Sequence, residues 1–309
     1  MKTESKIYIA GHRGMVGSSV VRELKKQGFN NLVFRTSQEL DLTQQSKVEE
    51  FFKNEKPTHV VLAAARVGGI LANSEHPTEF LYQNLMIASN VIHSAAESGV
   101  EKLLFLGSSC IYPKMAPQPL KEVCLLSGSL EPTNEAYAIA KIAGLKLTEY
   151  YNRQHGKKFI SAMPSNLYGP GDNYHPDQSH VIPGLIRRFH EAKINKTPIV
   201  KVWGTGTPLR EFLYVEDLAE ACVFLLKNYQ LPDFLNVGSG DEVTVKALAE
   251  SIAKTVGYTG SIQFDSGKPD GTPRKVLDSG KIHQLGWKSK MPLEQGLKLT
   301  YESFLNSNG

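Results

Sequence analysis

Hydrophobic residues in the first half of the chain follow two alternating periods. Short apolar or β-branched runs predict strands at 6–10, 32–35, 59–65, 102–107 and 159–163. Apolar residues at helical spacing between these runs predict helices from Val16 to Gly28 and at 44–54, 78–98 and 135–154. The run 59–65 is apolar on both sides, as in a parallel strand buried between helices. This alternation predicts an α/β fold with a doubly wound parallel sheet of the Rossmann type.

The texture of the sequence changes after about residue 170, where Gly, Pro and Asp become frequent and the predicted elements become short. These elements are a strand at 199–203 and helices at 183–193, 216–228, 244–256 and 293–305. We therefore expect a sheet domain at 1–170 and a smaller C-terminal lobe made mainly of 171–309. We also expect a strand at 234–237 to return to the sheet.

Composition and charge narrow the function classes. The chain has 309 residues, of which 41% are hydrophobic and 21% charged, as in ordinary globular proteins. The net charge of +4 is spread along the chain, which favours small anionic ligands over nucleic acid. The longest apolar run, 60–65, is too short to span a membrane, and residues 1–6 show no apolar signal region. Three cysteines without a CxxC pair argue against disulfides or a metal site, so we expect a soluble cytoplasmic protein without nucleic-acid or membrane partners.

A glycine-rich loop, Gly11-His-Arg-Gly14-Met-Val-Gly17, lies directly between the first predicted strand and the first predicted helix. Glycines there allow a tight turn and a close approach of the backbone to a pyrophosphate, which the helix start at Met15 and Val16 would face. Such a string alone is weak, because many glycine-rich loops are plain turns. Here the flanking strand, the helix and a βαβ spacing of about 30 residues are present, so the loop predicts a dinucleotide site.

The end of the second predicted strand indicates which dinucleotide is bound. An acid usually stands there to hold the ribose 2′-hydroxyl of NAD, but the segment 34–37 contains none. Arg35 in this segment and Arg13 in the glycine loop can instead bind a 2′-phosphate, so we expect NADP rather than NAD. The alternative is that both arginines are solvated. Asp41 and Leu42 are candidates for the border of the adenine, although Asp41 can equally begin the next helix.

Tyr137 and Lys141 are four residues apart and therefore share one face of a helix. We expect the ammonium to lower the pKa of the phenol, which could then exchange a proton with a carbonyl oxygen while a nicotinamide moves hydride. Alone, this pair is more often a surface pair. Ser108 favours a catalytic role for the pair, because it follows the predicted strand 102–107 at the sheet edge where ligands bind. Spacing does not tell whether Ser108 or Ser109 points into the site.

Along nearly its whole length the chain resembles the extended short-chain dehydrogenase/reductase superfamily. The similarity rests on 11–17, Ala63-Ala64-Ala65, Ser108, Tyr137 with Lys141, and Pro164-Ser-Asn-Leu-Tyr-Gly-Pro170. Within it, the chain is most similar to the GDP-L-fucose synthase family, bifunctional 3,5-epimerases and 4-reductases of GDP-4-keto-6-deoxy-D-mannose. The segments that carry this similarity are 65–70 (ARVGGI), 108–113 (SSCIYP), 166–173 (NLYGPGDN), 180–183 (HVIP) and 204–213 (GTGTPLREFL).

The resemblance implies an NADP-binding domain at 1–170 and a lobe at 171–309 that binds a GDP-sugar. It implies Ser108, Tyr137 and Lys141 as the reductase trio, Cys110 and His180 as the acid/base pair of epimerisation, and NADPH as hydride donor. Further cofactor contacts are implied at Pro164, Asn166, Leu167 and His180, and nucleotide-sugar contacts at Arg188, Trp203 and Arg210. Either Asp270 or Asp278 completes the sugar contacts. A homodimer through the helices 78–98 and 135–154 is implied as well.

Two other readings compete. A nucleotide-sugar 4,6-dehydratase of this superfamily has an Asp-Glu pair after the serine or threonine, where this chain has Ser109 and Cys110, and a 4-epimerase needs no thiol at position 110. A non-enzymatic NADP sensor would need none of Ser108, Tyr137 and Lys141.

Overall fold

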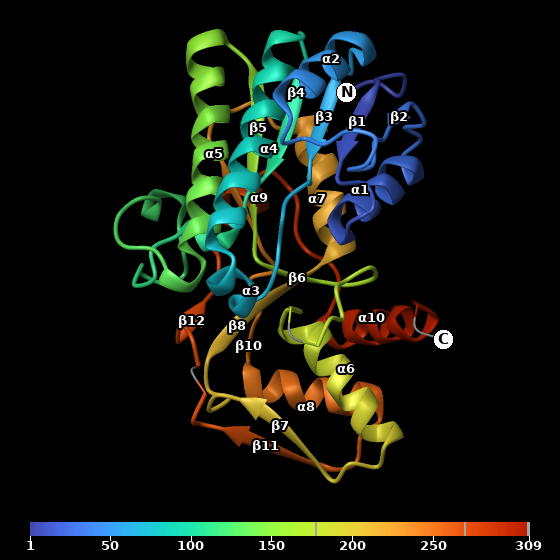
Figure 1. Ribbon diagram of the computed structural model, residues 1–309, viewed down its shortest axis with the longest axis vertical. Coiled ribbons are helices and arrows are strands. Elements are labelled where there is room, and N and C mark those ends of the chain that lie inside the picture. The colour runs from blue at the N-terminus through green and yellow to red at the C-terminus, as the bar shows by residue number, and fades with distance from the viewer. Residues whose placement is uncertain (177, 269, 308–309) are drawn as a thin grey trace.

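A computed structural model describes the chain except for residues 177, 269 and 308–309 (Figure 1). A parallel sheet with helices on both faces forms one half of the molecule, and a lobe of short strands and three longer helices forms the other. No described helix has the length and apolar character needed to cross a membrane.

The sheet has six parallel strands in the order β2-β1-β3-β4-β5-β9. They are β1 (Ile7–Ala10), β2 (Leu32–Val33), β3 (His59–Leu62), β4 (Lys102–Leu106), β5 (Lys158–Pro164) and β9 (Leu235–Val237). The chain runs outward from β1 to β2 and then returns to the other side of β1 to form β3. The carboxyl ends of β1 and β3 therefore flank a topological switch point, where ligands bind in open α/β sheets.

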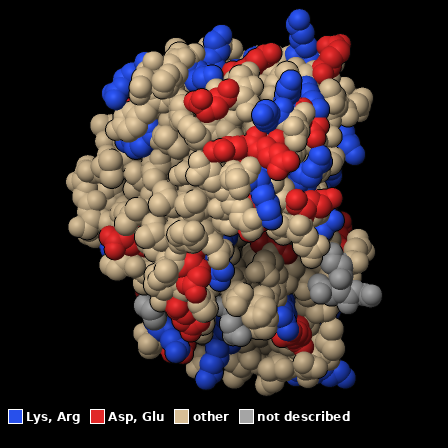
Figure 2. Space-filling view, turned by 45° about the horizontal axis from the view of Figure 1, so that its top comes forward, with Lys and Arg blue, Asp and Glu red and all other residues tan. Residues whose placement is uncertain are grey.

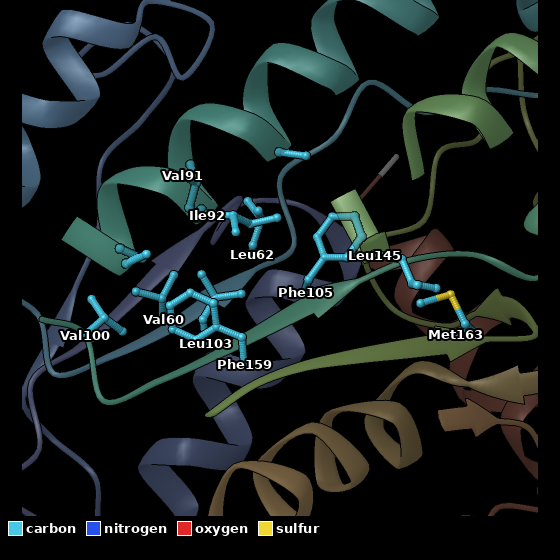
Figure 3. Close-up of a cluster of buried hydrophobic side chains, with 14 of the residues drawn as sticks. Val60, Leu62, Val91, Ile92, Val100, Leu103, Phe105, Leu145, Phe159 and Met163 are labelled. Atoms are coloured by element: carbon cyan, nitrogen blue, oxygen red, sulfur yellow. The ribbon is translucent and has the colours of Figure 1, made fainter. Parts of the chain in front are cut away.

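The two faces of the sheet are covered by different helices. On one face lie α2 (Gln45–Glu55), α4 (Pro77–Glu97) and α5 (Glu135–His155), and on the other lie α1 (Met15–Lys26) and α7 (Val215–Asn228). Figure 3 shows the first core layer, where Val60, Leu62 and Leu103 of the strands meet Val91 and Ile92 of α4. All five side chains are fully buried, which fixes the sheet and with it the loops at its carboxyl edge.

The predicted α/β fold is confirmed, and the predicted helices lie within a few residues of the observed ones. The segment expected to return to the sheet is β9, which pairs in parallel with β5 through Met163 and Asn236.

Several short elements, most of them in the lobe, were not predicted by the sequence pattern. They are the strands β6 (Asn166–Tyr168), β8 (Leu209–Tyr214), β10 (Glu242–Thr244), β11 (Ser261–Asp265) and β12 (Arg274–Lys275), and the helices α3 (Ile70–Glu75) and α9 (Gly280–Gln284). β8 pairs with β6, β10 and β12, and β11 pairs with β7 (Ile199–Trp203). The strands β6, β10 and β12 have only two or three residues and carry no detectable period, because their pairing depends on partners far away in sequence. The helices α6 (Val181–Ile194), α8 (Val245–Val256) and α10 (Leu293–Ser307) complete the lobe.

The carboxylate of Glu211 on β8 joins the lobe to the sheet domain. Glu211 is fully buried, and its two oxygens accept hydrogen bonds from the backbone N–H groups of Gly240 at 2.7 Å and Leu277 at 2.9 Å. Gly240 follows β9, and Leu277 follows β12, so one side chain aligns three segments. Burial raises the pKa of Glu211, and the amide donors oppose that rise.

We expect Glu211→Gln to lower the free energy of unfolding by about 2–4 kcal/mol in chemical denaturation. The glutamine amide turns two donor hydrogens toward an N–H group that needs an acceptor, in a place that water does not reach. The matched control is Glu242→Gln, because Glu242 pairs with Arg274 at the surface at 2.6 Å and its loss should cost below about 1 kcal/mol. Equal losses for the two variants would contradict the role given to Glu211.

Candidate active site

The glycine loop leaves room for an anion at the start of α1. Gly11 has φ +86°, and a Cβ there would meet the backbone nitrogen of Ala64 at 2.7 Å. A Cβ on Gly14 would meet only the Gly11 oxygen, at 3.4 Å, so the space above Gly14 is open. Gly14 is the N-cap of α1 and gives no side-chain cap, which leaves the first N–H groups of the helix, from Met15 and Val16 on, for a ligand. A pyrophosphate fits this cradle.

The two arginines expected at a 2′-phosphate lie in one corner. Arg35 donates to Glu55 at 2.8 Å and to the Phe34 oxygen at 2.6 Å, whereas Arg13 is exposed. The charges of both arginines act on Glu39 and help to lower its pKa, after the larger effect of the hydrogen bonds from Thr36. Glu39 is therefore an acidic residue close to the two arginines, although the segment 34–37 contains none. It follows the end of β2 by six positions, beyond the segment in which the acid that binds the ribose of NAD is expected.

Asp41 and Leu42 have structural partners. The carboxylate of Asp41 accepts hydrogen bonds from the backbone N–H and the hydroxyl of Thr43, at 2.9 and 2.7 Å, which lower its pKa. The oxygen of Leu42 accepts a hydrogen bond from Asn90 at 2.9 Å. The side chain of Asp41 is thus used in the turn before α2, the second of the two interpretations that the sequence left open.

Tyr137 and Lys141 share one face of α5, as the spacing predicted. The Lys141 amine is buried, donates to the Leu106 oxygen at 2.8 Å, and lies 5.6 Å from the centre of the Tyr137 ring. Burial lowers the pKa of Lys141 to about 8. The expected lowering of the pKa of Tyr137 is wrong for this structure: burial raises it, a charge on Cys110 raises it further, and a hydrogen bond with Ser108 acts in the opposite direction. Removal from water outweighs the neighbouring ammonium, so Tyr137 is a protonated phenol near neutral pH.

Ser108 and Cys110 lie at the carboxyl end of β4, in a short 3-10 turn over Ser109–Ile111. The Ser108 hydroxyl accepts a hydrogen bond from the Cys110 backbone N–H at 3.2 Å, while Ser109 is buried. The Cys110 sulfur accepts hydrogen bonds from the Asn134 amide at 3.2 Å and from the Lys275 amine at 3.5 Å. Neither Asn134 nor Lys275 could be predicted from the sequence as a partner of Cys110, because 24 and 165 residues separate them from it.

His180 is the N-cap residue of α6 and is exposed. The protein atoms around its ring lower its pKa, and the positive charge of Lys275 adds to this effect. Lys275 therefore lies within electrostatic reach of both Cys110 and His180. The two residues expected for epimerisation, which follow β4 and begin α6, are thus both influenced by one lysine of β12.

The strand β6 brings the expected cofactor contacts to the same edge. Pro164 ends β5, and Asn166 and Leu167 begin β6, which runs beside β8. The Asn166 amide donates to the Glu211 oxygen at 2.8 Å, so this segment is held by the same residue that joins the two halves.

The expected sugar-nucleotide residues gather in the lobe. Arg210 of β8 donates to the Asp270 oxygen at 3.3 Å, and the Asp270 carboxylate accepts a hydrogen bond from the Thr205 N–H at 2.7 Å. Trp203 is 60% exposed at the end of β7, with the Lys268 amine 5.4 Å from its ring centre. Arg188 on α6 is exposed and donates to the Lys201 oxygen at 3.2 Å.

Of the two aspartates left open by the sequence, the structure places Asp270 beside Arg210. Asp278 accepts a hydrogen bond from the Gly280 N–H at 2.9 Å and belongs to the turn before α9. Among the described residues, no three His, Cys, Asp or Glu side chains are grouped as metal ligands.

The chain is similar to known proteins along nearly its whole length. Residues 7–238 match the family described as the NAD dependent epimerase/dehydratase family. GDP-L-fucose synthase 1 of Arabidopsis thaliana is 60% identical over 98% of this chain and 94% of its own length. GDP-L-fucose synthase of Escherichia coli K12 is 55% identical over 99% of this chain and 98% of its own. A solved GDP-L-fucose synthetase from Naegleria fowleri bound to NADP superposes with a TM-score of 0.91 at 30% identity and covers 100% of this chain and 96% of that one.

The loop that follows β6 carries a carboxyl group that should make stability depend on pH. Asp172 lines a cavity of about 400 Å³ together with Tyr174 and Arg187, and one of its oxygens is buried with no hydrogen-bond partner among the described residues. Burial raises its pKa from 3.8 to about 7. The folded state binds this proton more tightly than the unfolded state, so the contribution of Asp172 is favourable at low pH and is lost as pH rises from about 4 to 7.

We expect Asp172→Asn to remove that loss, so that at pH 8 the variant is more stable than the parent chain by about 2–4 kcal/mol, while near pH 4 the two are similar. Urea denaturation across this pH range measures the difference. A constant difference between the two proteins at every pH would contradict the raised pKa.

Proposed function

The chain belongs to the NAD dependent epimerase/dehydratase family, and we propose that it is a GDP-L-fucose synthase that epimerises GDP-4-keto-6-deoxy-D-mannose at C3 and C5 and then reduces C4 with NADPH. The observation that carries this proposal is the Cys110 thiol, 3.5 Å from an amine, in the turn that also holds Ser108 of the reductase trio. A reductase alone needs no ionisable thiol there. The names of the relatives at 60% and 55% identity support the same activity.

NADPH fits the glycine loop and its surroundings. The open space above Gly14 suits the pyrophosphate, and the guanidinium groups of Arg13 and Arg35 suit the 2′-phosphate. We assign further contacts to the backbone of Asp41 and to Leu42 at the adenine, to Pro164 at the end of β5, to Asn166 and Leu167 on β6, and to Lys141 and His180. When bound, this cofactor supplies the hydride for C4.

Epimerisation uses the acidity that a 4-keto group gives to its neighbours. Cys110 as thiolate takes the proton from C3 or C5, so that an S–H bond forms while the C–H bond breaks and its electron pair moves onto O4 as an enolate. Ser108 and Tyr137 hold the enolate oxygen through their hydroxyl groups. His180 returns a proton from the opposite side, with its lowered pKa favouring release.

Reduction requires a proton for O4, and Tyr137 is suited to give it. Its raised pKa keeps the phenol protonated until negative charge develops on the substrate oxygen. Lys141, whose pKa is about 8, lies against the Tyr137 ring and provides positive charge to compensate the phenolate that forms.

We assign the substrate to the lobe at 171–309 and the cofactor to the sheet domain at 1–170 together with β9. Arg188 and Arg210 supply positive charge for the diphosphate, Trp203 offers an exposed aromatic wall, and Asp270 lies beside Arg210. Asp278, whose carboxylate accepts a hydrogen bond from Gly280 in the turn before α9, is the alternative contact.

We further propose that the protein is a homodimer through α4 and α5 and that it acts in the cytoplasm. These helices pack against each other and expose Tyr82 and Tyr150, by 58% and 45%. Figure 2 shows a broad area without charged side chains on this side of the molecule. The reducing cytoplasm keeps a thiol such as Cys110 free to ionise.

The first test concerns the cofactor. Arg35→Ala should weaken NADPH about 10–150-fold while NADH changes little, because a charge-assisted hydrogen bond to the 2′-phosphate is worth about 1.5–3 kcal/mol. Titration with both cofactors measures this. The control is Glu55→Gln, which breaks the Arg35 ion pair but keeps the guanidinium, and should leave NADPH binding intact. Equal weakening of NADPH and NADH by Arg35→Ala would show that Arg35 does not contact the 2′-phosphate.

The second test separates the two reactions. Cys110→Ser should abolish deuterium uptake at C3 and C5 of the sugar while NADPH still binds, because a hydroxyl is far too weak a base near neutral pH. His180→Gln should slow the same uptake. Tyr137→Phe should stop NADPH oxidation but retain some exchange, because the phenol donates its proton only in the reduction. If Cys110→Ser exchanged deuterium at the parent rate, another residue would be the base.

A further inference from the structure

The Cys110 sulfur has polar partners from two segments that are distant from each other in the chain. It accepts hydrogen bonds from the Asn134 amide at 3.2 Å, in the turn before α5, and from the Lys275 amine at 3.5 Å, on β12. A negative charge on Cys110 also acts on Tyr137 of α5. Both of the contacts to sulfur are donors, which stabilise a sulfur anion and do nothing comparable for a neutral thiol.

Among the residues that the structure describes, no carboxylate lies within ion-pair distance of the Lys275 amine. The neighbouring Arg274 on β12, by contrast, is paired with both oxygens of Glu242. Lys275 is partly buried, so water screens its charge less than that of a surface lysine. Its position is fixed by the pairing of Lys275 with Arg210 on β8.

The same charge also reaches the acid. His180 at the start of α6 is a group whose protonation Lys275 opposes. One ammonium therefore favours loss of a proton from both Cys110 and His180. Cys110 must be ionised before it can act as a base, and His180, once protonated, becomes a stronger acid toward the carbanion.

Resting on the proposed function, we propose that Lys275 is the positioning residue of the epimerase step: its ammonium stabilises the Cys110 thiolate. Lys275 itself exchanges no proton with the sugar. The effect passes through the sulfur, so it should appear in the protein without any substrate.

The test measures the reactivity of Cys110 in the full chain with a Cys124→Ser background. Cys222 does not interfere, because it is fully buried and its pKa is raised to about 12. The rate of alkylation of Cys110 by iodoacetamide is followed by mass spectrometry from pH 5.5 to 9. In Lys275→Met the pH midpoint should rise by about 1 unit, whereas Lys275→Arg should stay near the parent value.

The matched control is Arg274→Met, which removes one positive charge from the adjacent residue and should leave the midpoint unchanged. Circular dichroism verifies that each variant is folded, and Lys275→Gln serves as a second variant should the methionine disturb β12. The imidazole resonance of His180, assigned with His180→Gln, should titrate at higher pH in Lys275→Met, because the opposing charge is gone.

Kinetics then separate positioning from substrate binding. In Lys275→Met, deuterium uptake at C3 and C5 should fall about tenfold at pH 7, with the KM for the GDP-sugar and the affinity for NADPH unchanged. An unchanged alkylation midpoint would overturn the proposal, and with a raised KM it would make Lys275 a substrate-binding residue. If the midpoint shifts but the parent protein shows no uptake into the GDP-sugar, the coupling of Lys275 to Cys110 stands and the proposed function fails.

Discussion

The buried carboxylate of Glu211 is the constraint on which the geometry of the site depends. Its oxygens hold the backbone after β9 and after β12, and its own carbonyl oxygen accepts the Asn166 amide of β6. Taking a carboxylate out of water costs several kcal/mol unless each lone pair finds a donor. The amide donors meet that requirement only when the segments are correctly aligned. Satisfying one charge therefore sets the position of Lys275, two residues before Leu277.

The two chemical steps require opposite states of two neighbouring groups. Epimerisation needs an anionic base, and reduction needs a neutral acid. Burial raises the pKa of Tyr137, and a negative charge on Cys110 acts in the same direction, so the phenol stays protonated beside a thiolate. The Cys110 sulfur accepts hydrogen bonds from two donors, at 3.2 and 3.5 Å. The proximity of the two groups thus supports the division of their roles.

The sequence predicts the parts of this site that lie within one element or at its end. The glycine loop and the pair of Tyr137 and Lys141 depend on local spacing, and the Rossmann sheet follows from strands and helices of sufficient length. Three features could not be predicted. The pKa of Tyr137 depends on burial. Glu39 comes within electrostatic reach of Arg13 and Arg35 only in the folded chain. Lys275 belongs to a two-residue strand that forms only by pairing with β8. Each depends on contacts between residues distant in sequence or on removal from water, which no local pattern records.

The surroundings of Cys110 are set by the fold itself. The polar contacts at its sulfur come from the turn before α5 and from β12, and β12 is anchored by pairing with β8. A charge arrangement built in this way is fixed by folding, so it does not have to be assembled at the cost of substrate binding energy. Arg210 and Asp270, which we assign to the sugar nucleotide, belong to the same strand system. Binding and proton transfer are therefore aligned by one sheet, and a shift of β8 would disturb both together.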